Sequence, residues 1–238
     1  DGSVATPWLL TDIYGVQGMA TYHAGNFALA NDIDASGTAN WWGDAGFVPI
    51  GGGPTTFSGL FDGLGHVISG LTISRPTRGF VGLFGEVGTI TIRDVGLEGG
   101  SVTGQGITGG LVGYMASGTI TRSYNTGEVG SVLQPNVGGL VGYMASGTIT
   151  ESYATGAVTS FGSAESYVGG LVGHVASGTV TESYATGAVS GLGNYVGGLV
   201  GQLWGGITQS YATGTVRGFS SYVGGLVGGQ WGNIAQSH

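Results

Sequence analysis

The amino-acid sequence predicts an all-β protein, a right-handed parallel β-solenoid (β-helix) with an N-terminal capping segment. Two observations carry this prediction. The segment GGLVGYMASGTIT occupies residues 109–121 and recurs without change at 138–150, and related segments begin at Gly169 and Gly197. The repeats consist of short β-branched runs separated by Gly, with no apolar pattern of helical length. Repetition on this scale indicates stacked supersecondary units.

The period of the repeat lies near 29 residues. Gly-Leu-Val-Gly begins at positions 110, 139, 170, 198 and 225, and the variant Gly-Leu-Phe-Gly begins at position 82. We expect three short strands per unit, near GLVG, GTIT and SYATGAV. Coils of a parallel solenoid stack about 4.8 Å apart, so equivalent residues form columns. One predicted inward column contains Ile90, Ile120, Ile149, Val180 and Ile207.

Differences in repeat length are confined to one corner. The segments GSVLQPN, TSFGSAESY, SGLGNY and RGFSSY lie between a late Val of each unit and the next Gly-Gly-Leu-Val-Gly. Insertions are typical of surface loops, so we expect a loop at this corner. The late Val column contains Val129, Val158, Val189 and Val216.

The chain divides into two predicted parts. Residues 1–56 break the repeat and combine a weakly helical stretch with a first strand, and we expect them to cap the exposed edge of the solenoid. Residues 57–238 form a solenoid of about seven coils, with GLUG-like repeats from about residue 80.

Composition excludes several classes of partner. The 238 residues include five Arg and no Lys against thirteen Asp and Glu, for a net charge of -8. Nucleic acid is therefore an unfavourable ligand, because phosphate binding needs a dense basic surface. The chain has no Cys, and its apolar runs are shorter than the roughly 18–20 residues that span a bilayer, so neither disulfides nor membrane insertion is expected.

The repeats resemble a known family. GGLVGYMASGTITRSYNTG is similar to the GLUG repeat. The segments GNFALANDIDAS, GFVPIGG and FSGLFDGLGHVISGLTI resemble those that precede such repeats in filamentous-haemagglutinin-like adhesins of bacterial two-partner secretion. This resemblance implies a passive extracellular stalk or adhesive module with no catalytic residues, secreted or held at the cell surface.

Threonines form the first candidate binding face. If Ile points inward, the flanking threonines point outward on a grid spaced about 4.8 Å between coils and about 6.6 Å along the strand. Such a grid resembles the flat faces of ice-binding β-solenoids, although Thr is also a good strand residue on any solvated face. Polar residues follow each pair at once, so either a bend intervenes or the inward assignment of Ile is wrong. The array comprises Thr89, Thr91, Thr119, Thr121, Thr148, Thr150, Thr179, Thr181 and Thr208.

Aromatic residues form the second candidate face. A Tyr column that includes Tyr153, Tyr184 and Tyr211 could offer stacking platforms to sugars, although aromatic ladders also stabilise contacts between coils. Trp204 and Trp231 lie 27 residues apart in the last coils. They could contact carbohydrate, a neighbouring domain, or further sequence of a longer chain.

The sequence predicts no enzyme, cofactor or metal site. Asp62 and His66 in FDGLGH are read as turn residues, Asp32 and Asp34 lack the calcium-repeat context, and the four His residues have no metal-ligand spacing. Two functions remain. The leading hypothesis is a structural or adhesive module that contacts surface or host glycan or protein, and the alternative is an ice-binding protein that contacts the surface of an ice crystal.

Overall fold

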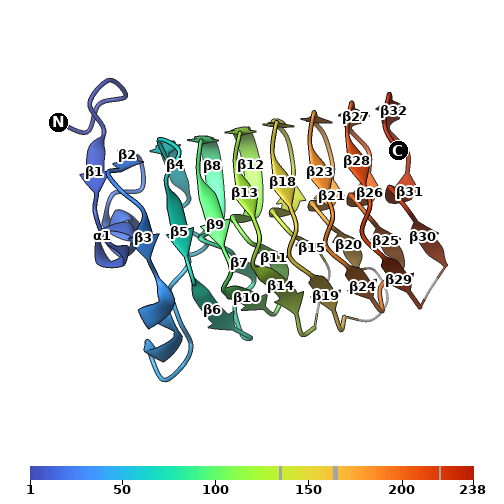
Figure 1. Cartoon of the computed structure of the whole chain (residues 1–238), viewed down its shortest axis with the longest axis horizontal. Coiled ribbons are helices and arrows are strands. Elements are labelled where there is room, and N and C mark those ends of the chain that lie inside the picture. Colours follow the sequence, from blue (N-terminus) through green and yellow to red (C-terminus); the bar gives the residue numbers. More distant parts are fainter. Residues whose placement is uncertain (134–135, 163–165, 220) are drawn as a thin grey trace.

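The computed structural model describes residues 1–133, 136–162, 166–219 and 221–238. It shows a rod of stacked β-coils whose strands pair in parallel along the long axis (Figure 1). The predicted parallel β-solenoid is confirmed. Six complete coils run from β4 to β30, and β31 and β32 begin the next, so the expected seven is close to the observed number.

Each coil contributes to four sheets rather than supplying the three strands expected. The largest, sheet A, has thirteen strands: β1 (Trp8–Leu10), β2 (Asn26–Leu29), β4 (Phe57–Asp62), β8 (Phe84–Arg93), β12 (Val112–Thr121), β16 (Val141–Met144), β17 (Thr148–Thr150), β21 (Val172–Val175), β22 (Thr179–Thr181), β26 (Val200–Leu203), β27 (Gly206–Thr208), β31 (Val227–Gln230) and β32 (Asn233–Ala235).

Sheets B, C and D follow along each coil. Sheet B contains β3 (Ile33–Asp34), β5 (Val67–Ser69), β9 (Gly96–Glu98), β13 (Tyr124–Asn125), β18 (Tyr153–Ala154), β23 (Tyr184–Ala185) and β28 (Tyr211–Ala212). Sheet C contains β6 (Thr72–Arg75), β10 (Ser101–Gly104), β14 (Glu128–Ser131), β19 (Val158–Ser160), β24 (Val189–Gly191) and β29 (Val216–Gly218). Sheet D contains β7 (Phe80–Val81), β11 (Ile107–Gly109), β15 (Asn136–Gly138), β20 (Tyr167–Gly169), β25 (Tyr195–Gly197) and β30 (Tyr222–Gly224).

Sheet D corrects the prediction of a loop at the variable corner. Its strands carry the sequence Tyr-Val-Gly in the later coils, and the register pairs Tyr167 with Tyr195 and Tyr195 with Tyr222. Part of the corner is therefore regular structure. The stretches that vary in length lie between sheets C and D, and residues 134–135, 163–165 and 220 of these stretches are outside the described chain.

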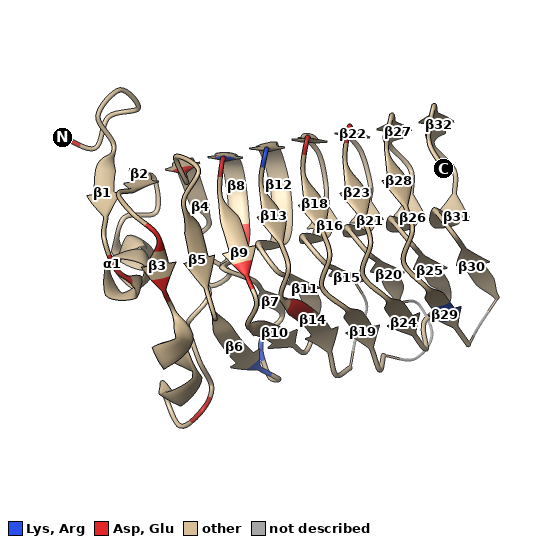
Figure 2. Ribbon diagram, viewed as in Figure 1, with Lys and Arg blue, Asp and Glu red and all other residues tan. Residues whose placement is uncertain are grey.

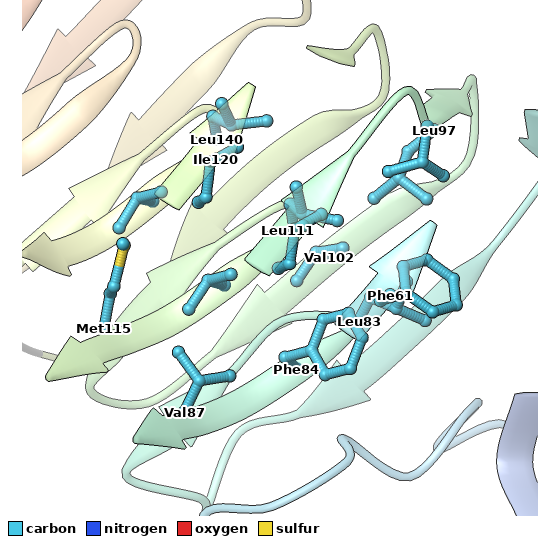
Figure 3. Packing of buried hydrophobic residues seen from close by; sticks show 14 of the residues in the cluster. Phe61, Leu83, Phe84, Val87, Leu97, Val102, Leu111, Met115, Ile120 and Leu140 are labelled. Atoms are coloured by element: carbon cyan, nitrogen blue, oxygen red, sulfur yellow. The ribbon is translucent and has the colours of Figure 1, made fainter. Parts of the chain in front are cut away.

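The predicted inward column lies in the core, with one change. Ile120, Ile149 and Val180 lie in register and are fully buried. Ile92 rather than Ile90 precedes Ile120 in this column, because β12 pairs with β8 two residues away from the expected match. In the first coils the interior is filled by Phe61, Phe84 and neighbouring aliphatic side chains, and Figure 3 shows these residues pointing between the sheets.

A second, smaller core lies between sheets C and D. It consists only of valines, which pair from coil to coil in the predicted late Val column and in the sheet D strands. Its members are Val129, Val137, Val158, Val168, Val189 and Val196, with Val216 packed against them.

A sharp corner joins sheets A and B, so a bend rather than a wrong inward assignment explains the polar residues after each Thr pair. One residue per coil adopts a left-handed backbone conformation there, with φ between 45° and 54°: Asp94, Arg122, Glu151, Glu182, Gln209 and Gln236. The residue that follows in most coils is a serine. The Oγ of Ser152 accepts a hydrogen bond from the backbone N–H of Ser123 at 3.2 Å and donates one to the carbonyl of Thr150 at 2.8 Å. Equivalent bonds continue through Ser183, Ser210 and Ser237.

The N-terminal segment lies against the first coils. Its helix α1 (Ile13–Gly18) begins at Asp12, whose carboxylate accepts from the N–H of Gly15 at 2.7 Å, and buries Ile13 and Val16. The 3-10 helices η1 (Met19–Thr21) and η2 (Ser36–Asn40) follow. Because β1 and β2 extend sheet A beyond β4, the segment covers part of that sheet edge. The division at residue 56 stays a prediction.

Candidate binding surfaces

The predicted threonine array lies on the outer surface of sheet A. Each Thr pair flanks a buried residue of the Ile column, so both side chains point away from the core. The register aligns Thr119, Thr148 and Thr179 in one column and Thr121, Thr150, Thr181 and Thr208 in another.

The array departs from the expected register at its first coil and ends in the last coil as expected. Thr89 lies opposite Ser117, Thr91 opposite Thr119, and Arg93 takes the place below Thr121. At the other end, Gly206 continues the column of Thr179. Complete Thr-x-Thr rows therefore occupy three coils, and Thr91 and Thr208 each extend a single column.

Charged side chains border the threonine face on the side of the corner. Arg122 forms a bidentate pair with Asp94, with nitrogen–oxygen distances of 2.6 and 2.9 Å, and Arg93 pairs with Asp62 at 2.6 Å. Figure 2 shows that such residues concentrate in the first coils, and after Glu182 the sequence contains one Lys, Arg, Asp or Glu, namely Arg217. The later coils therefore present a nearly uncharged surface.

The predicted Tyr column forms a continuous stack on sheet B. Adjacent rings from Tyr124 to Tyr211 lie nearly parallel, with centroids 4.7, 4.7 and 5.0 Å apart, and His238 stacks on Tyr211. Desolvation and a hydrogen bond from the hydroxyl to Glu98 raise the pKa of Tyr124. The ring faces of Tyr153, Tyr184 and Tyr211 are covered by their neighbours, which leaves edges rather than faces for a ligand.

A second aromatic column, which the sequence analysis missed, runs beside the corner of sheets D and A. His174 lies between Tyr143 and Tyr167, with ring centroids 4.8 and 5.0 Å away. Both of its ring nitrogens are buried without a hydrogen-bond partner, and desolvation lowers its pKa to about 4. The imidazole is therefore neutral at ordinary pH.

The two predicted tryptophans are brought together on the outer surface of the last coils. Their ring centroids lie 6.2 Å apart, and Trp231 also contacts Tyr195 edge-on at 5.6 Å. Trp204 is 59% exposed and Trp231 is 56% exposed. This pair is a shallow aromatic patch on an uncharged surface.

A concave aromatic surface lies in the N-terminal segment, where the sequence predicted no site. Tyr14 and Gln17 of α1 and Trp41 and Trp42 after η2 line a cleft of about 420 Å³. Tyr14 stacks on Trp41 at a centroid distance of 5.1 Å. The Trp-Trp pair was the available signal, but only the fold places it beside α1.

Four residues considered for catalysis or calcium binding make hydrogen bonds within the protein: Asp32, Asp34, Asp62 and His66. Asp62 binds Arg93, while His66 contacts Asp32 across 3.0 Å. Hydrogen bonds from the backbone of Val67 and from His66 lower the pKa of Asp32, and Asp34 accepts from the N–H of Ser36. Among the described residues, no group of three or more His, Cys, Asp or Glu is placed to hold a metal ion.

Comparison with known proteins identifies the repeat. The GLUG motif matches residues 134–159, 164–190 and 193–217. The chain carries GLUG repeats. The resemblance of the preceding segments to filamentous-haemagglutinin-like adhesins stays a prediction.

Two relatives match about half of the chain at moderate identity. Halomucin of Haloquadratum walsbyi is 40% identical over 126 residues, which is 50% of this chain and 1% of the relative. A “Putative Gly-rich membrane protein” of Evansella cellulosilytica is 37% identical over 119 residues, covering 48% of this chain and 14% of the relative. The chain thus spans a small part of both relatives.

A solved structure shares the architecture. It is described as a “putative immunoglobulin A1 protease” from Bacteroides ovatus and matches 99% of this chain and 76% of its own, with a TM-score of 0.79 and 24% sequence identity. At this identity the likeness supports the fold alone. Within the described residues, no helix is long and apolar enough to cross a membrane.

Proposed function

We propose that this chain is a non-catalytic, extracellular structural or adhesive module of a surface or secreted protein. The observation that carries the proposal is that the coils stack with equivalent residues in register. Hydrogen bonds between serines at the corner of sheets A and B, and stacked tyrosine rings on sheet B, link each coil to the next. Such a stack is a stiff rod whose outer columns can hold contacts at fixed intervals. Its partners are glycans or proteins at its own or a host surface, and neighbouring domains of a longer chain.

Two further observations support this proposal. The polar and charged residues weighed for catalysis are engaged in local turns and ion pairs. In addition, one relative that matches about half of the chain is named as a membrane protein. Both fit a module that acts by contact rather than by chemistry.

The location of the protein tests this proposal directly. Antibodies raised against the purified chain are expected to label intact source cells or to detect the protein in their medium. External protease is expected to remove the label from intact cells. Detection only after the cells are permeabilised contradicts an extracellular role.

Ice binding is the second candidate, and the register of the threonine columns favours it. Three coils present Thr-x-Thr rows at the spacing of the strands, about 4.8 Å. Thr150→Tyr places a bulky ring in the middle of this grid and is expected to abolish thermal hysteresis. The exposed Thr215 lies outside the grid, so Thr215→Tyr is the matched control. Absence of hysteresis in the parent protein eliminates ice binding.

A further inference from the structure

The N-terminal aromatic cleft is a built site rather than a chance grouping of side chains. Trp41 stacks on Tyr14 on one side and approaches the fully buried Phe47 on the other, with a centroid distance of 6.4 Å. The three rings form one continuous aromatic wall that begins in the core and ends in solvent. Tyr14 is 71% exposed at its outer end.

Hydrogen bonds hold the two sides of the cleft together. The side chain of Gln17 on α1 donates to the carbonyl of Val48 at 3.0 Å and accepts from the N–H of Val48 at 2.9 Å. The buried Thr38 of η2 donates its hydroxyl to Ala35 and accepts from the N–H of Thr72 on β6. The walls are thus fixed to each other and to the first coil, which lowers the entropy cost of binding.

The backbone at Trp42 is held in an unfavourable conformation. Its φ is 54°, in the left-handed region that bulky residues rarely adopt, and the ring is 72% exposed. Gly43 and Asp44 continue with positive φ, and a hydrogen bond from the N–H of Gly46 to the carbonyl of Trp41 closes the loop. A strained backbone that holds a large aromatic ring in solvent is a recognised mark of a functional position.

The charges near the cleft disfavour an anionic ligand. The guanidinium of Arg75 donates to the carbonyls of Gly46 and Phe47 and is therefore committed to the loop backbone. Asp12 and Asp44 flank the lining residues in sequence, so the local field repels anions. Phosphate, sulfate and acidic polymers are poor occupants for this reason.

The cleft is shallow, and this favours a ligand that can keep one side in water. Sites for wholly apolar small molecules enclose most of the ligand surface. Here the outer rings are more than two-thirds exposed, so most of an apolar ligand would stay in water. A pyranose ring suits such a cleft because one face carries C–H groups that pack on an aromatic ring, whereas its hydroxyls remain hydrated.

From this geometry we propose that the cleft formed by Tyr14, Gln17, Trp41 and Trp42 binds a neutral carbohydrate, with a pyranose face packed on the exposed rings. The remaining N–H of Gln17 and the indole N–H groups supply donors for hydroxyls. This inference rests on the proposed surface function, since it specifies neutral carbohydrate as the class of partner that binds at the N-terminal end of the rod.

Binding of neutral oligosaccharides to the purified chain tests this assignment. Cellohexaose, chitohexaose, xylohexaose, mannohexaose and laminarihexaose are titrated calorimetrically at up to millimolar concentration. At least one is expected to bind, with an affinity unchanged by high salt because no charge takes part. Trp42→Gly removes the ring and suits the positive φ, so it is expected to weaken binding roughly tenfold or more without lowering thermal stability.

Matched variants assign the site. Tyr14→Ala is expected to weaken binding to a similar degree, whereas Trp204→Ala removes an exposed ring at the other end of the rod and is expected to leave affinity unchanged. The proposal is overturned if no oligosaccharide binds, if binding survives Trp42→Gly, or if it depends on Trp204. A dimer that Trp42→Gly dissociates assigns the cleft to a second copy instead and also overturns it. Labelling of intact cells without oligosaccharide binding refutes this site but leaves the surface function standing.

Discussion

Close packing between coils makes a strong prediction about one glycine position of the repeat. Gly110, Gly139, Gly170, Gly198 and Gly225 occupy the same place in successive coils. A methyl group at Gly170 would overlap the carbonyl oxygen of Gly198 and lie 2.8 Å from the Cβ of Ala185. At Gly225, a methyl group would meet nothing within 4 Å. Neither glycine has positive φ, so the two sites differ in space rather than in backbone preference.

The expected loss of stability follows from these contacts. Carbon atoms in contact normally lie about 3.5–4.0 Å apart, so Gly170→Ala requires the neighbouring coil to shift. Overpacking of this kind costs about 1–3 kcal/mol, and we expect the upper end because the obstacle is backbone held in a ladder. Since Gly225→Ala meets open space, its effect should stay within about 0.5 kcal/mol.

Urea unfolding of the two variants measures this difference. Gly170→Ala should lower the midpoint clearly, while Gly225→Ala should unfold with the parent protein. Equal losses in both variants, or no loss at Gly170, would show that contact between coils does not restrict this position.

Two other predictions concern buried polar groups. Ser152→Ala leaves the N–H of Ser123 without its acceptor and should lower the free energy of unfolding in urea by about 1–3 kcal/mol. Ser146 is exposed, so the control Ser146→Ala should lower it by less than about 0.5 kcal/mol. Similar losses in both variants would contradict a stabilising role for the serine hydrogen bonds between coils. His174 has a pKa near 4 in the folded chain and an ordinary value of 6.5 when unfolded, so its contribution to stability is lost as pH falls from about 6.5 toward 4. Because the residue is partly exposed, we expect this loss of unfolding free energy to be about 1–2 kcal/mol. The His174→Tyr variant should therefore lose less stability between pH 6.5 and 4 than the parent protein. An equal loss in the two proteins would show that His174 does not cause the pH dependence.

Repetition made most of the solenoid predictable. In a parallel stack, equivalent residues one period apart lie next to each other in neighbouring coils. The column of Ile120, Ile149 and Val180 could therefore be predicted from the sequence. The coil that begins with β8 was misaligned because Thr89 to Ile92 alternate Thr and Ile, which allows two registers by residue type. The pairing of Val87 with Met115 selects the other register, since it brings two buried side chains together.

The remaining features depend on contacts that repetition does not reveal. Sheet D was missed because its corner varies in length, although Tyr-Val-Gly recurs within it at 167–169, 195–197 and 222–224. The aromatic cleft lies in the part of the chain without repeats. Tyr14 and Trp41 meet because α1 is hydrogen-bonded to Val48 and η2 packs on β6, and a single sequence carries no periodic signal for such a contact.

The nearest-neighbour arrangement of the coils has a mechanical consequence. Each coil is held mainly by the coils on either side, so tension applied between the two ends can peel coils away singly while the rest stay folded. The repeat spacings of 27 to 31 residues correspond to about 100 Å of extended chain released at each step. A rod of this kind lengthens stepwise under load, and each unfolding step dissipates mechanical work.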